Sequence, residues 1–156
     1  MRKRIRSQQP PPASDDVQWL DLVALCEVEL TSEDPRFPIE GALSGTLSAG
    51  WRASQPGEQT IQLVFDRPQR LTRIRLSFRE DTRSREQEFV LSWRGDDTGP
   101  LREIVRQQYF FSPPGTNVEE EDYRVELAAV KSLQITIVPD RSDSSAIASL
   151  ARLQIA

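Results

Sequence analysis

The sequence predicts an all-β fold, an antiparallel jelly-roll β-sandwich of about eight strands. Three observations lead to this prediction. Apolar and polar residues alternate over short runs, turn-forming residues separate the runs, and no amphipathic helix of ten or more residues follows position 23. Alternation with a period of two puts one face of each strand in a core and the other in water, as in antiparallel sheets.

The chain divides into a tail and one domain. Residues 1–14 carry four basic residues, no acidic residue and a run of three prolines, a composition typical of a disordered, extended tail. Residues 15–156 have the length of one ordinary domain, which can bury roughly two-thirds of its surface without a disulfide. The first part of this domain, residues 15–22, fits either one helical turn or the entry strand, and the sequence leaves both open.

Alternation locates the strands in order. Within residues 71–78, Ile74, Leu76 and Phe78 alternate with arginine and serine, so these three side chains are expected in the core. The same pattern predicts strands over residues 25–30, 60–65, 71–78, 89–93, 123–127, 133–138 and 147–155.

Turn signals stand between these runs. Residues 66–69 (DRPQ) predict a tight link between two strands, and residues 95–100 (GDDTGP) predict a longer hairpin loop. Residues 113–115 (PPG) and 139–140 (PD) end the later strands.

Several other residues can be assigned by their place in these runs. Trp51 and Trp93 are expected in the core, the latter because it alternates in phase with Phe89. Phe110 and Phe111 are consecutive in a β stretch, so their rings should point to opposite faces and one should be exposed. The acidic run at residues 119–122 is expected to be a solvated loop.

Composition excludes several classes of chemistry. The chain has no histidine, which rules out a serine triad, a Cys–His pair and a histidine-bearing zinc site. Its one cysteine, Cys26, allows no intramolecular disulfide and is expected to behave as a small buried hydrophobe. There is no apolar run long enough for a membrane helix and no secretory signal, so we expect a cytoplasmic protein, or a fragment of a larger one, with no membrane partner.

A family resemblance follows from the order of motifs over residues 42–92. A small-residue loop precedes Trp51, and then come a polar loop, a strand, the tight link at 66–69 and a second strand. The segment 88–92 (EFVLS) and a Gly-Asp-Asp turn at 95–97 complete the series. This order resembles the discoidin family, the coagulation factor V/VIII type C domains of galactose-binding-like fold. It is similar to bacterial carbohydrate-binding modules and to the N-terminal domain of the eukaryotic single-strand-break repair scaffold.

The resemblance implies that the C-terminal strand, within residues 146–155, pairs with the first strand. Many relatives also hold a structural Ca²⁺, at positions that correspond here to Ser44, Gly45 and Arg152. Calcium requires several hard oxygen ligands, and these residues are poor substitutes, so we expect neither calcium nor another cofactor.

In the family, three loops at one end of the sandwich recognise ligands, and they correspond here to residues 31–38, 52–58 and 79–86. The resemblance therefore makes eight side chains the candidates for ligand binding: Arg36, Phe37, Arg52, Gln55, Arg79, Asp81, Arg83 and Arg85. Arginine, aspartate and glutamine can make paired hydrogen bonds to sugar hydroxyls, and Phe37 supplies a ring for the apolar sugar face. The charged run at 79–86 also fits a solvated, self-neutralising segment.

The favoured function is a non-catalytic module that binds carbohydrate. The alternative is an intracellular module of the same fold that binds a protein or is associated with nucleic acid. Direct contact with nucleic acid is not expected, because the net charge of −4 becomes more negative still without the basic tail. An enzyme using two carboxylates is also not expected, because no pair of acidic residues stands out.

Overall fold

The computed structural model describes residues 17–44 and 50–156 and contains two short helices and eight strands. The predicted tail at 1–14 and the candidate Gly45 lie outside the described residues. In chain order the elements are α1 (Leu22–Leu25), β1 (Cys26–Leu30), α2 (Glu40–Leu43), β2 (Trp51–Pro56), β3 (Gln59–Arg79), β4 (Arg85–Arg94), β5 (Arg102–Phe111), β6 (Val118–Val138), β7 (Ile147–Leu150) and β8 (Arg152–Ile155). None of the described helices is long and apolar enough to cross a membrane.

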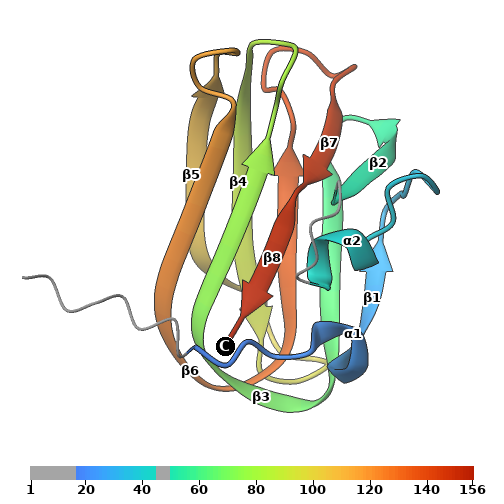
Figure 1. Cartoon of the computed structure of the whole chain (residues 1–156). Helices are drawn as coiled ribbons and strands as arrows, with labels where there is room; N and C mark the ends of the chain where they lie inside the picture. Colours follow the sequence, from blue (N-terminus) through green and yellow to red (C-terminus); the bar gives the residue numbers. More distant parts are fainter. Residues whose placement is uncertain (1–16, 45–49) are drawn as a thin grey trace, which may run out of the picture.

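Two long strands build both layers of the sandwich. β3 and β6 each run for 21 residues, and they pair with each other antiparallel along both of their halves. Each strand turns back at the lower end of the molecule, so its two halves lie in opposite layers (Figure 1). One layer contains β1, the first half of β3, the second half of β6, β4 and β5. The other contains β8, the second half of β3 and the first half of β6.

The link predicted at residues 66–69 is therefore a bend within one strand and not a turn between two. The pairing of β3 with β6 is irregular between Val64 and Arg73, where Asp66, Arg67 and Pro68 are exposed. A bulged, bent strand can switch layers at such a corner while its backbone pairing continues on either side. The strands predicted at 123–127 and 133–138 are likewise the two halves of β6.

The C-terminal strands do not pair with β1 as the resemblance implied. β8 pairs with the second half of β3, and β7 pairs with β2 in a separate two-stranded sheet. The chain near its start does reach the end of β8, because the amide of Leu20 donates a hydrogen bond to the carbonyl of Ile155 at 2.8 Å. Of the two structures left open for residues 15–22, the helical turn is found only from Leu22 onward, where Asp21 caps α1.

The core lies between the two layers and follows the predicted alternation. Ile74, Leu76 and Phe78 are fully buried, as is Trp51. Trp93 is only partly buried, and the Cζ of Arg102 lies 5.7 Å from the centre of its ring. Phe111 is buried and Phe110 is 66% exposed, which confirms that consecutive phenylalanines on β5 face opposite ways. Cys26 is half-buried against the core, and burial raises the pKa of its thiol to about 11.

Position 50, just before β2, requires glycine because the backbone there passes close to Leu150 and Ala151, where β7 ends. Its φ is +77°, and a Cβ placed on it would lie 2.4 Å from the carbonyl oxygen of Leu150. Gly57 also has a positive φ, +85°, but a Cβ there would meet nothing closer than 3.6 Å. The two glycines therefore share the backbone requirement and differ in the space available for a side chain.

Replacing Gly50 by alanine should lower the free energy of unfolding by about 3 kcal/mol, because backbone strain and overpacking add together. The Gly57→Ala variant should lose only about 1 kcal/mol, since it adds strain alone. Urea unfolding of the two variants and the wild type measures both losses. Equal losses would show that β2 does not approach Leu150 as closely as described.

Candidate functional site

Three segments far apart in the sequence meet at the upper end of the sandwich (Figure 1). They are the loop at residues 31–38 after β1, the strand β2, and the loop at residues 80–84 between β3 and β4. The start of β7 lies beside them because it pairs with β2. The segment predicted as the second loop, 52–58, is mostly strand, with Trp51 and Ala53 buried and Arg52 and residues 54–56 exposed.

Ser32 joins the first loop to β2. Its hydroxyl accepts hydrogen bonds from the backbone amides of Ser54 and Gln55 at 3.2 and 3.3 Å. The same hydroxyl donates to Oε1 of Gln59 at 2.7 Å. Gln59 is buried at the start of β3, so this network ties the loop and β2 to the main sheet.

The backbone of Arg52 is fixed from both sides. Its amide donates to the carbonyl of Phe37 at 3.1 Å, and its carbonyl accepts from the amide of Asp34 at 2.9 Å. Arg52 also stands opposite Ser149 in the pairing of β2 with β7. Its guanidinium carbon lies 4.4 Å from the centre of the Phe37 ring, a distance at which a cation is attracted to the ring face.

Arg85 holds the third loop in place from below. Its side chain is 2% exposed, and its Nε donates to Glu80 at 2.8 Å. Its Nη1 donates to the side chain of Gln87 and to the carbonyl of Pro139, and its guanidinium lies over the ring of Phe111. Burial alone would raise the pKa of Glu80, but hydrogen bonds from Arg85 and from the amide of Thr82 outweigh burial and lower it.

These segments surround a groove of about 690 Å³ with a strongly polar lining. Five arginines line it, together with three acidic residues and four residues that bear hydroxyls. The arginines are Arg36, Arg52, Arg79, Arg83 and Arg85, the acids are Asp34, Glu80 and Asp81, and the hydroxyls belong to Ser54, Thr82, Ser145 and Ser149. A neighbouring hollow of about 540 Å³ shares Arg52, Arg79, Asp81 and Ser149 with the groove.

Most of the arginines in the groove are paired with carboxylates. Arg36 bonds Asp34 at 2.9 Å, Arg79 bonds Asp81 at 3.0 Å, and Arg83 pairs with Asp143 of the loop after β6. A hydrogen bond from a guanidinium stabilises the charged form of a carboxylate and so lowers its pKa. The guanidinium of Arg36 lowers the pKa of Asp34, and hydrogen bonds from Ser145 and then Arg83 lower the pKa of Asp143 to about 2.

Six of the eight candidate residues line this one groove. The exceptions are Phe37, which lies under Arg52, and Gln55, whose exposed side chain is not part of the lining. Arg85 lies beneath the groove, so we assign it a supporting position, and its contact with a ligand stays a prediction. Ser149 was missed because only the register of β7 against β2 brings it here, and Ser145 because it lies in the loop that leads into β7.

The acidic run at residues 119–122 is part of β6, so the prediction of a loop was wrong. Glu119 and Glu121 stand opposite Phe78 and Leu76 of β3 and are partly buried. Burial, and then the neighbouring Glu121, raise the pKa of Glu119 to about 7. Asp122 faces the other way and bonds Arg73 and Arg75, which lower its pKa to about 2. These acids are separate from the lining of the groove.

The described residues contain no cluster of three or more acidic, cysteine or histidine side chains able to hold a metal ion. Two of the positions aligned with the calcium ligands of relatives are described, Ser44 at the end of α2 and Arg152 on β8. Neither residue type supplies the carboxylate oxygens that calcium favours.

Comparison with known proteins identifies the fold. No family model and no curated relative matches the chain. Among solved structures, a family 32 carbohydrate-binding module of AlyQ in complex with 4,5-unsaturated mannuronic acid is 18% identical, with a TM-score of 0.64 over 90% of this chain and 98% of that one. The family 32 module of NanJ from C. perfringens, in complex with galactose, is 13% identical, with a TM-score of 0.64 over 88% and 96% of the two chains.

A third similar structure is reduced XRCC1 bound to the catalytic domain of DNA polymerase β. It is 12% identical, with a TM-score of 0.62 over 85% of this chain and 95% of that one. These likenesses confirm the predicted fold: the chain is an antiparallel β-sandwich of the galactose-binding-like type, shared by carbohydrate-binding modules and by XRCC1.

The two ion pairs that Arg85 and Arg83 form, with Glu80 and Asp143, should differ in their effect on stability. Arg85→Met leaves Glu80 with a largely buried, unpaired charge and should lower the free energy of unfolding by about 3 kcal/mol. Arg83→Met removes a pair in which both side chains are more than one-third exposed, and should have a much smaller effect. Thermal and urea unfolding of both variants test this difference, and similar losses would contradict the anchoring role of Arg85.

Proposed function

We propose that this domain is a non-catalytic carbohydrate-binding module that takes a sugar into the groove at the upper end of the sandwich. The observation that carries the proposal is the lining of the groove, where arginines, carboxylates and hydroxyls from three segments converge. A volume of about 690 Å³ lies in the range of small-ligand sites.

The chemistry of the lining suits a polyhydroxylated ligand. Guanidinium groups offer several N–H donors in one plane, and carboxylates offer acceptors, so together they can bond adjacent hydroxyls of a sugar ring. The arginine–carboxylate pairs hold these side chains in position before a ligand arrives, which lowers the ordering cost of binding. Because the Phe37 ring is covered by Arg52, hydrogen bonds rather than ring stacking would supply most of the specificity.

The same pairs disfavour glycoside hydrolysis. A glycosidase needs a carboxylic acid whose pKa is raised so that it can protonate the leaving oxygen. In the groove, the pKa values of Asp34 and Glu80 are lowered by their arginine partners. The described carboxyl with a raised pKa, Glu119, lies outside the lining.

A panel of neutral and acidic mono- and oligosaccharides tests the proposal, read out as a rise in melting temperature and then by calorimetric titration. At least one sugar class should bind, and Arg79→Ala should weaken it by about ten-fold or more through lost charge-assisted hydrogen bonds. Arg67→Ala, at the bend of β3 far from the groove, is the matched control and should bind like the wild type. No binding by any sugar would refute the proposal.

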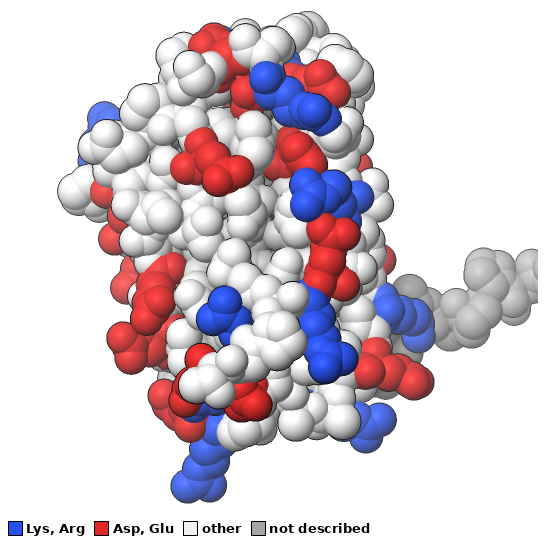
Figure 2. Space-filling model, turned by 180° about the vertical axis from the view of Figure 1, so that it is seen from behind, with Lys and Arg blue, Asp and Glu red and all other residues white. Residues whose placement is uncertain are grey.

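A second candidate is a module that binds a protein through β5. Phe110 is the most exposed large hydrophobic residue described, and among the described strands β5 pairs only with β4. Seen from behind, basic residues lie among acidic ones without forming a basic patch on that face (Figure 2), which suits a protein better than nucleic acid. This second candidate is a module that acts inside the cell.

Phe110→Ser separates the two candidates. The ring is exposed, so the free energy of unfolding should change by less than about 0.5 kcal/mol. Sugar binding should also be unchanged, because Phe110 is not part of the groove. If the second candidate is right, the immobilised wild-type domain retains a partner that this variant loses, and retention by both proteins would count against a role for β5.

A further inference from the structure

We propose that the groove recognises an anionic sugar through its carboxylate, and that Arg52 is the residue that binds this group. The inference rests on the proposed function and names the ligand class for the same site. It comes from a difference between Arg52 and the other arginines that surround the groove.

Arg52 is the one arginine of the lining without a carboxylate partner among the described residues. Arg36, Arg79, Arg83 and Arg85 each bond an aspartate or glutamate. Asp34 is the acid near Arg52, and Arg52 contributes to its lowered pKa, but both of its oxygens are already bonded to Arg36. The positive charge of Arg52 is therefore not neutralised by a hydrogen-bonded acid.

The contacts of Arg52 leave its guanidinium donors available. The guanidinium carbon lies 4.4 Å from the centre of the Phe37 ring, and within the described part of the chain none of the guanidinium N–H groups forms a hydrogen bond. A guanidinium attracted to a ring in this way still offers N–H donors, which can bond a carboxylate through two parallel hydrogen bonds. The backbone bonds to Phe37 and Asp34 hold the residue in this place.

The position of Arg52 puts these donors at the centre of the binding surface. It lines both the groove and the neighbouring hollow. Ser149 stands directly opposite on β7 and lines both spaces as well, so its hydroxyl can bond the same ligand. A sugar acid with its carboxylate on Arg52 would place its ring hydroxyls near Arg79 and Asp81.

Electrostatics favours an anion here. The chain as a whole carries a net charge of −4, whereas arginines outnumber acidic residues in the lining of the groove. A neutral sugar would leave the charge of Arg52 partly desolvated and unpaired, which is unfavourable, and a carboxylate removes that penalty.

Calorimetric titration of an oligouronate and of the same oligosaccharide with its carboxyls reduced to alcohols tests the inference. The wild type should bind the acid form at least about ten-fold more tightly than the reduced form. Arg52→Gln should remove this preference while keeping the melting temperature of the wild type. Arg52→Lys, which keeps the charge and loses the planar fork, should recover part of the preference.

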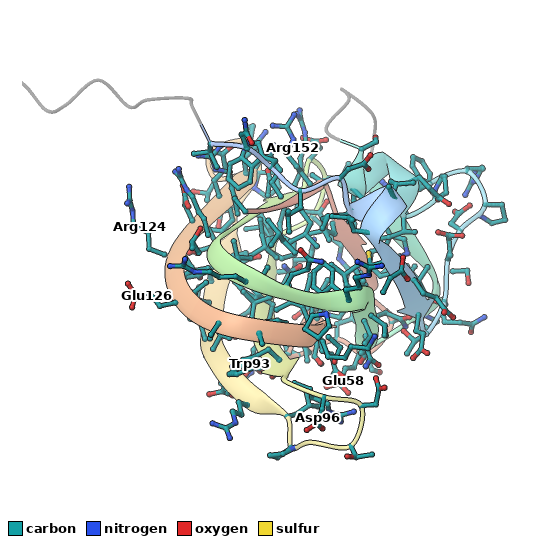
Figure 3. All side chains as sticks on the ribbon, turned by 90° about the horizontal axis from the view of Figure 1, so that it is seen from below. Glu58, Trp93, Asp96, Arg124, Glu126 and Arg152 are labelled. Carbon is teal, nitrogen blue, oxygen red and sulfur yellow. The ribbon has the colours of Figure 1, made fainter. Side chains whose placement is uncertain are left out.

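Arg124→Gln is the control, because Arg124 projects outward from β6, away from the interior, and the variant changes the net charge by the same amount (Figure 3). Equal affinity for the two sugars would overturn the inference and leave the proposed function standing. An equal loss of the preference in the control, full affinity in Arg52→Lys, or tighter binding of a sulfated sugar would also overturn it. Failure of every acidic and neutral sugar would refute the proposed function itself.

Discussion

The pairing of β3 with β6 along both of their halves is the constraint on which the rest of the molecule depends. Because β3 bends back at residues 66–70, its first residue, Gln59, and its last, Arg79, both lie at the upper end of the sandwich. Gln59 receives the first loop through Thr31 and Ser32, and Arg79 opens the third loop. One bent strand thus connects to both the first and the third loop of the groove, and the core packed between the two layers sets the distance between its ends.

On this frame the groove is organised by arginine–carboxylate bonds of two kinds. The buried pair of Arg85 and Glu80 fixes the third loop to the carbonyl of Pro139 and to the core ring of Phe111. The exposed pairs, such as Arg79 with Asp81, contribute little to stability but keep donors and acceptors in defined positions. Arg52 differs from both kinds, because an aromatic ring and not an acid fixes its side chain. Under the proposed function, this difference is the reason to expect a sugar that carries a carboxylate.

The fold could be predicted because its signals are local. Alternation around Ile74 and Phe89, and the opposite faces of Phe110 and Phe111, depend only on the period of a strand. The acidic start of β6 could not be found in this way, because Glu119 and Glu121 are polar and yet face inward, where pairing with β3 places them. For the same reason Ser149 was missed: its neighbour in space is Arg52, nearly a hundred positions away, and only the register of β2 with β7 brings them together. The bend in β3 has the sequence of a turn, because Pro68 and its polar neighbours are residue types that turns also favour.

The central claim is that this end of the sandwich is the binding surface, and mapping of backbone amide chemical shifts by NMR tests it most directly. Titration with the tightest-binding sugar of the panel should shift amides of the 31–38 loop, β2, the 80–84 loop and β7, and leave those of β5 unchanged. Shifts confined to β5 around Phe110, or spread evenly over the sheets, would contradict the account.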